Sequence, residues 1–256
     1  QFIKKYQLIK INHMNSEIKS VSIIVIITAI IIVVGLALTK STPKTTSVVV
    51  NGDTLVSTTT PMILGTKQPE SQNVTIIEFG DFACPACAML SPTMDKLLKE
   101  YEGSVNYGIR LIPIHGEISY KSAVAAFAAG KQGRFFEMAS TLFAKQDEWT
   151  KVGADTDALF AGYATEVGVG DIAVFKSDLA SETFNKVIRQ MVDRDADQGR
   201  DMKIQSTPTL IIGADHKVVE GVSSYAELKK IIDDAIEAAK NAPAATSTSN
   251  GAATTP

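Results

Sequence analysis

The chain has 256 residues and a formal net charge of −3, with 45% hydrophobic and 21% charged residues. This balance is typical of an ordinary folded protein. It lacks the basic excess of a nucleic-acid binder and so argues against that class. The length permits one or two domains.

The first apolar feature is residues 21–38, VSIIVIITAIIIVVGLAL, which hold 18 positions without a charge. A run of this length is near the lower limit for a helix that spans a bilayer, and it is too long for an ordinary strand. We therefore expect an uncleaved transmembrane anchor at 21–38. Residues 1–20 before it are expected to be a cytoplasmic stub, in which Met14 is the expected true start.

The orientation of this anchor follows from the lysines around it. Lys19 precedes the run, and positive charges favour the cytoplasmic side, so the rest of the chain is expected outside the cytoplasm. The alternative is a cleaved signal peptide, with Gly35 and Ala37 as a small-x-small cleavage site. Both interpretations place the folded part in a compartment where disulfides persist.

Three segments follow the anchor. Residues 39–72 are rich in Thr, Ser, Pro and Gly and are predicted to be a linker, with a possible β-hairpin at Asn51–Gly52. Residues 73–241 are predicted to form one domain. Residues 242–256 are of low complexity and are predicted to be a disordered tail.

Within 73–241 the predicted elements run strand–helix–strand, a block of helices, then strand–strand–helix. NVTIIEFGDF (73–82) and SVNYGIRLIPI (104–114) are apolar runs typical of buried strands, and the residues between them have helical periodicity. Helices are expected over about 117–203. This order predicts an α/β fold with a parallel crossover.

The chain has two cysteines, Cys84 and Cys87, separated by Pro85 and Ala86. A zinc site would need about four ligands, and none of the three histidines has finger spacing with the pair. A structural disulfide would close a very small loop and gain little entropy. It remains an alternative, as do two inert thiols. A reactive dithiol is favoured, with no metal and no cofactor expected.

The position of the cysteines predicts a role for each. Cys84 stands where the predicted helix begins, and there backbone N–H groups and the helix dipole stabilise a thiolate. Pro85 suits the first helical turn because it has no N–H to leave unpaired. We therefore expect Cys84 to be an exposed nucleophile and Cys87, one turn later, to be buried and to resolve the mixed disulfide. Phe82 is the candidate for an exposed apolar contact beside them.

The stretch FGDFACPACAML (79–90) resembles the active site of the DsbA-like thiol oxidoreductases of the thioredoxin superfamily. IPIHGEISYKSAVAAFAAGKQGRFFEMASTLFAKQ (112–146) resembles their membrane-anchored and secreted subgroup. The resemblance implies a thioredoxin fold with a helical insertion. It implies that Glu78, six residues before Cys84, is a buried acid that relays protons to Cys87. It also implies that Ser206–Thr209 is a cis-proline loop.

In that loop, the resemblance assigns Thr207 and Pro208 to the face of the cysteine pair. Ser206 and Thr209 join Phe82 as candidate contacts of the substrate. Ala86 stands where the strongest oxidants of the family carry a histidine. The helix terminus and the backbone N–H groups are therefore expected to be the main causes of a lowered pKa of Cys84.

The function implied by the resemblance is thiol–disulfide exchange outside the cytoplasm, with disulfide formation in reduced or unfolded exported proteins. A membrane partner of the DsbB or VKOR type would re-oxidise the dithiol. The alternatives are a disulfide reductase or isomerase of the same fold, and a non-catalytic binding or chaperone module.

Overall fold

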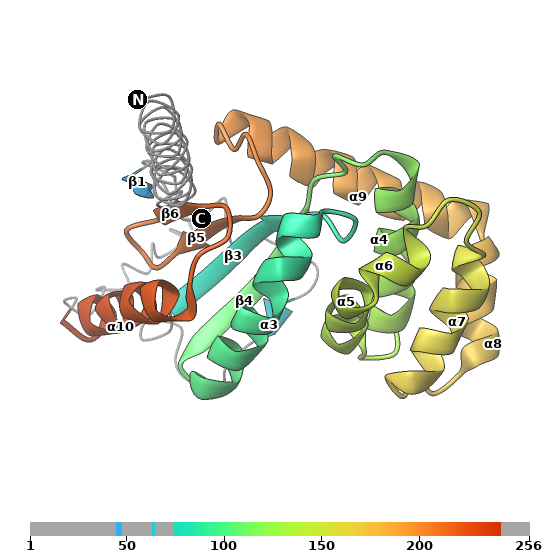
Figure 1. The fold of residues 1–256 in the computed structure, drawn as a ribbon, viewed down its shortest axis with the longest axis horizontal. Helices are drawn as coiled ribbons and strands as arrows, with labels where there is room; N and C mark the ends of the chain where they lie inside the picture. The colour runs from blue at the N-terminus through green and yellow to red at the C-terminus, as the bar shows by residue number, and fades with distance from the viewer. Residues whose placement is uncertain (1–44, 48–62, 65–73, 242–256) are drawn as a thin grey trace, which may run out of the picture. The chain divides into compact units, whose positions relative to one another are not determined.

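The computed structural model describes residues 45–47, 63–64 and 74–241 (Figure 1). The predicted anchor at 21–38, the Asn51–Gly52 hairpin and the tail over 242–256 lie outside these residues. Of the helices that the structure describes, none combines the length and the apolar character needed to cross a membrane.

A single mixed sheet holds the six described strands, in the order β1-β6-β5-β3-β4-β2. The strands are β1 (Thr45–Ser47), β2 (Ile63–Leu64), β3 (Val74–Gly80), β4 (Val105–Leu111), β5 (Thr209–Ile212) and β6 (Lys217–Glu220). Strand β3 pairs in parallel with β4, as the predicted crossover requires, and antiparallel with β5. Two pieces of the predicted linker, β1 and β2, pair with β6 and β4 at opposite edges.

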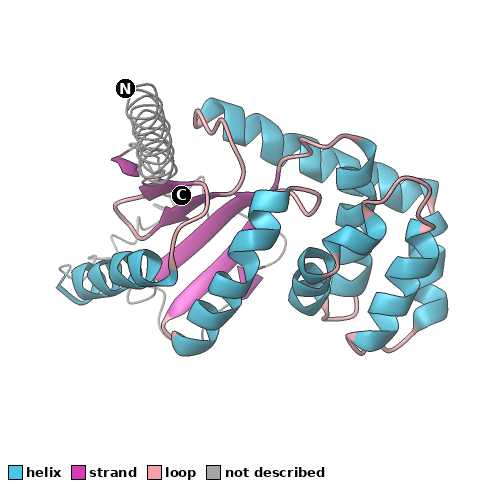
Figure 2. Ribbon diagram, in the orientation of Figure 1, coloured by secondary structure: helices cyan, strands magenta, loops and turns pink. Residues whose placement is uncertain are grey.

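The helices fall into two groups (Figures 1 and 2). They are α3 (Pro85–Glu100), α4 (Glu117–Gly130), α5 (Phe135–Ala144), α6 (Gln146–Trp149), α7 (Thr156–Glu166), α8 (Ile172–Ala180), α9 (Glu182–Asp201) and α10 (Tyr225–Asn241). Helices α3 and α10 contact each other and strand β3 contacts α10. Helices α4 to α9 form one insertion between β4 and β5, called the helical insertion below. Helix α8 is not among the predicted elements, although Asp171 caps it by accepting a hydrogen bond from Val174 N.

The two faces of β3 serve different cores, because successive side chains of a strand point to opposite sides. Ile76 belongs to the large core that includes α3 and the helical insertion. Ile77 and Phe79 belong to a smaller core on the other face, with Ile211 and Val218. Glu78 has the same parity as Ile76, so it points toward α3.

Helix α9 crosses the smaller core at close range, and Gly199 makes this possible. A Cβ at Gly199 would lie 3.0 Å from Ile112 Cδ1 and 3.6 Å from Phe79 Cδ1. The same helix is tied to β4 through the buried Arg110, which lies 3.9 Å from Asp195. The helical insertion is therefore anchored to β4, the neighbour of the strand that leads into the cysteine-bearing turn.

Candidate active site

The turn between β3 and α3 ends in Cys84, the N-cap residue of α3. Cys84 N donates to Asp81 O at 2.9 Å, and Cys84 O accepts from Ala88 N at 3.1 Å. Pro85 occupies the first helical position, and no side chain caps the helix. The unpaired N–H groups of the first turn are therefore left for the Cys84 sulfur.

Both cysteines are free thiols and both are buried. Cys84 is 5% exposed and Cys87 is 0% exposed. The predicted burial of Cys87 is confirmed, whereas the predicted exposure of Cys84 is wrong for this form of the protein. The Cys84 sulfur is covered because it lies against the loop before β5, where Sγ donates to Thr207 O at 3.6 Å.

The pKa values of the two thiols move in opposite directions. The hydrogen bond from the Cys87 thiol is the largest influence on Cys84 and lowers its pKa from 9.0 to about 5, against the effect of burial. The Thr207 side chain and the backbone N–H groups of Cys87 and Ala86 lower it further. The same hydrogen bond raises the pKa of Cys87, followed by burial and the nearby charge of Glu78. Near neutral pH the pair therefore holds one thiolate, on Cys84, and one thiol.

The loop before β5 lies against the pair because Thr209 pairs with Phe79 at the end of β3. The Thr207–Pro208 peptide bond is cis, as expected. The Thr207 hydroxyl is buried and has no hydrogen-bond partner among the described residues. It can therefore rotate to donate to a thiolate on Cys84.

Of the three predicted substrate contacts, only Ser206 is exposed. Phe82 is 0% exposed, so its predicted exposure is wrong. Helix α5 covers it, with ring centroids 6.4 Å away at Phe135 and 5.2 Å away at Phe143. Thr209 is buried too, and its hydroxyl donates to Ser206 O at 2.8 Å.

Glu78 is 2% exposed and lies beneath Cys87. A Cβ at Gly80 would lie 3.0 Å from Glu78 Oε1 and 3.7 Å from Cys87 Sγ, so glycine leaves the space that the carboxyl group and the sulfur share. Tyr107 OH donates to Glu78 Oε2 at 2.5 Å. Burial raises the pKa of Glu78 to about 7, the bond from Tyr107 opposes this, and the charges of Asp95 and Cys84 add to it. Glu78 can therefore take up and release a proton near neutral pH.

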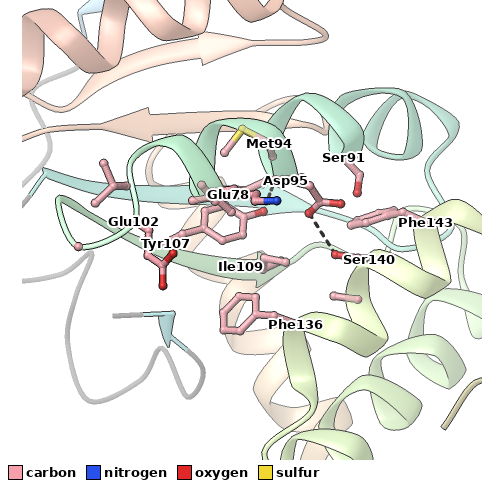
Figure 3. A pocket seen from close by; sticks show the side chains of 15 residues that line it. Glu78, Ser91, Met94, Asp95, Glu102, Tyr107, Ile109, Phe136, Ser140 and Phe143 are labelled. Atoms are coloured by element: carbon pink, nitrogen blue, oxygen red, sulfur yellow. Dashed lines mark hydrogen bonds between the residues drawn. The ribbon is translucent and has the colours of Figure 1, made fainter. Parts of the chain in front are cut away.

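A cavity of about 360 Å³ reaches Glu78 from the side of α3, β4 and α5 (Figure 3). Asp95 lines it and accepts a hydrogen bond from Ser140 Oγ at 3.1 Å. Exposed residues such as Lys99 and Glu102 form part of its wall, so the cavity opens to solvent. The remaining lining residues are Ser91, Met94, Leu98, Gly103, Val105, Tyr107, Ile109, Phe136, Ala139 and Phe143.

Asp81 is a site residue that the sequence reasoning missed. It is 1% exposed, and Oδ1 accepts from Ala83 N at 2.9 Å. Oδ2 contacts Ser119 Oγ at 2.8 Å and His115 Nδ1 at 2.9 Å. A polar residue directly after a buried strand was the available signal.

Tyr107 and Gln146 were also missed, and they reach the turn from distant segments without any motif of their own. In the part of the chain that the structure describes, no group of three or more His, Cys, Asp and Glu side chains is placed to hold a metal ion.

Comparison with known proteins decides the family. The thioredoxin family model matches residues 57–234, which is more than half of the chain. The chain belongs to the thioredoxin family. Within this family it is a DsbA-like thiol–disulfide oxidoreductase. It is 30% identical over 169 residues to disulfide bond formation protein D of Bacillus subtilis (strain 168), covering 62% of this chain and 71% of that protein.

This thioredoxin-family chain matches nearly all of one further relative and only a small part of another. The crystal structure of oxidised BdbD from Bacillus subtilis is 28% identical, with a TM-score of 0.59, covering 70% of this chain and 94% of that one. The Na(+)/H(+) antiporter NhaA 1 of Mycolicibacterium gilvum (strain PYR-GCK) is 32% identical over 143 residues, 54% of this chain. The chain spans only 21% of that antiporter.

Proposed function

We propose that this oxidoreductase introduces disulfides into exported proteins outside the cytoplasm. The domain would be held at the membrane by residues 21–38, with its N-terminus in the cytoplasm. The name of the Bacillus relative, a disulfide bond formation protein, supports the oxidising direction.

The reaction starts from the oxidised form, in which Cys84 and Cys87 share a disulfide. A substrate thiolate attacks Cys84 Sγ, forms a mixed disulfide and expels Cys87 as a thiolate, which takes a proton from Glu78. A second substrate thiolate then attacks the substrate sulfur of the mixed disulfide. This step releases the Cys84 thiolate and leaves the substrate with a disulfide, so two electrons have passed to the cysteine pair.

The observation that carries the oxidising direction is the lowered pKa of Cys84, about 5. A stabilised thiolate favours the reduced form of the pair over its disulfide, and it is a good leaving group in the second step. The disulfide form is therefore the reactive one, and reduction of the pair releases free energy.

The redox potential tests this direction. Equilibration with glutathione buffers is expected to give a potential nearer to about −120 mV, as for a strong oxidant, than to about −270 mV, as for thioredoxin. A value close to the thioredoxin end would support the reductase alternative instead.

The proposed partners follow from the same chemistry. Substrates would be reduced or unfolded exported proteins, and the reduced pair would pass its two electrons to a membrane enzyme of the DsbB or VKOR type. The Cys87→Ala variant is expected to accumulate mixed disulfides with clients that carry a disulfide: its Cys84 thiolate attacks one client sulfur and releases the other as a thiolate, and no neighbouring thiol then frees Cys84. A Cys84→Ser variant should trap none, and retained function of that variant in cells would support a non-catalytic binding module.

A further inference from the structure

Gln146 reaches the active-site turn from the helical insertion. It is 8% exposed and begins α6. Its Nε2 donates to Phe82 O at 2.7 Å and to Cys84 O at 3.0 Å. One amide group, 62 residues along the chain from Cys84, therefore binds the backbone on both sides of Ala83.

The two carbonyl groups depend on this contact to different degrees. Cys84 O also accepts from Ala88 N within α3. Phe82 is completely buried, and the bond from Gln146 is the one hydrogen bond described for its carbonyl. A buried carbonyl group that loses its only donor destabilises the conformation that buries it, so the turn would move if this donor were removed.

Gln146 is itself held firmly. Thr150 Oγ1 donates to Gln146 O at 2.7 Å. In the same short helix, Trp149 is 0% exposed, and its indole N–H donates to Leu142 O at 2.8 Å. The Trp149 ring packs edge-on against Phe160 with centroids 5.6 Å apart. The Gln146 side chain is therefore fixed by the core of the helical insertion.

We propose that Gln146 is a positioning residue that sets the conformation of the active-site turn from the helical insertion, so that the N–H groups at the start of α3 face the Cys84 sulfur. This inference rests on the proposed exchange at Cys84. Asp81 holds the beginning of the turn through Ser119, at the start of the insertion, and Gln146 holds its end. The helical insertion thus supports the turn at two points, and the second acts directly on the nucleophile's own carbonyl.

The test compares Gln146→Met with Gln132→Met. Gln132 is a matched control, because its Nε2 also donates to a backbone carbonyl, Asp171 O at 3.0 Å, within the insertion but away from the cysteines. We measure the rate of Cys84 alkylation by iodoacetamide from pH 4 to 9, the redox potential in glutathione buffers and the melting temperature. Gln146→Met is expected to lower the thiolate fraction of Cys84 at pH 6 several-fold and to slow exchange, while Gln132→Met leaves both unchanged.

A loss of stability alone would not support a positioning role. If Gln146→Met unfolds at a lower temperature but keeps the titration of Cys84 and the potential of the wild type, the inference is wrong. If Gln146→Met does not fold, the side-chain amide of Gln146 in the wild type is measured by NMR instead. Slow hydrogen exchange that changes on oxidation of the cysteine pair supports the inference, and exchange as fast as that of an exposed glutamine overturns it.

The proposed function has a separate test, so the two can fail independently. Oxidised wild-type protein that leaves a reduced client without any disulfide would refute the exchange at Cys84. Wild-type exchange with an unaffected Gln146→Met variant would refute only the role of Gln146.

Discussion

A single hydrogen bond between the sulfurs of Cys84 and Cys87 gives the two residues different roles. The Cys87 thiol donates to Cys84, which lowers the pKa of Cys84 and raises that of Cys87. The thiol that is nearer the cis-proline loop is thereby kept ready to react. The deeper one stays protonated until Glu78 removes its proton.

This coupling predicts how Cys84 titrates. In the reduced wild type, the rate of alkylation of Cys84 should rise with pH around a midpoint near 5. Replacing Cys87 by alanine removes the largest cause of the shift, so the midpoint should rise by about one unit or more. Midpoints that coincide for the two proteins would show that the helix terminus, and not Cys87, controls the nucleophile.

The buried Glu78 is expected to lower the stability of the protein while it supports its activity. Its pKa is raised from 4.5 to about 7, so it costs stability as pH rises from 4.5 through 7. Glu78→Gln should therefore stabilise the protein at pH 8, by on the order of 2 kcal/mol in urea unfolding. The same variant should slow exchange, because no group then transfers a proton to and from Cys87.

The control for this prediction is Glu102→Gln. Glu102 lines the same cavity but is exposed, and its replacement should change neither stability nor exchange appreciably. A Glu78→Gln variant that is less stable than the wild type at pH 8 would contradict the assignment of a raised pKa.

Helix α5 covers the active-site turn, because Phe143 and Phe135 pack on Phe82. Phe143→Ala is expected to cost about 3–4 kcal/mol of unfolding free energy. It should also alter the reactivity of Cys84, because the turn loses the side chain that packs on it.

Phe175→Ala, in α8, is the matched variant. Phe175 is 0% exposed and Phe143 is 6% exposed, so a similar loss of stability is expected, but Phe175→Ala should leave the alkylation rate of Cys84 unchanged. Equal effects of both variants on Cys84 would mean that general loosening, and not the contact with Phe82, controls the turn.

The contact between α5 and Phe82 shows which part of the site could not be predicted from the sequence. Cys84, Cys87 and Glu78 share one strand–turn–helix segment, so their spacing along the chain was enough to place them together. The burial of Phe82 depends on α5, and the donor to Phe82 O comes from Gln146, 64 residues away. Contacts of that range are set by how the insertion docks on the turn, which neither periodicity nor motif spacing encodes.

For the whole molecule, the redox state of two sulfurs should set its stability. The pKa of Cys84 is lowered from 9.0 to about 5, so the stability contributed by its thiolate is fully present above pH 9 and is lost as pH falls through 5.

Calorimetry of both forms checks this. At pH 8 the reduced protein should melt at a higher temperature than the oxidised protein, and the difference should shrink toward pH 5. A reduced form that is less stable than the oxidised form at pH 8 would indicate a reducing enzyme.

The cavity that Glu78 lines opens away from Cys84 and Thr207, neither of which lines it. A client polypeptide bound at Cys84 and Thr207 would cover the side of the cysteine pair that faces the loop before β5. The opening lined by Asp95 and Glu102 lies on the side of α3 and α5 (Figure 3). Protons would then reach the buried carboxyl group of Glu78 through this opening while the client stays attached. The rate of turnover would then depend on binding and release of the client and of the re-oxidising partner. Proton transfer to Glu78 would not require the client to dissociate first.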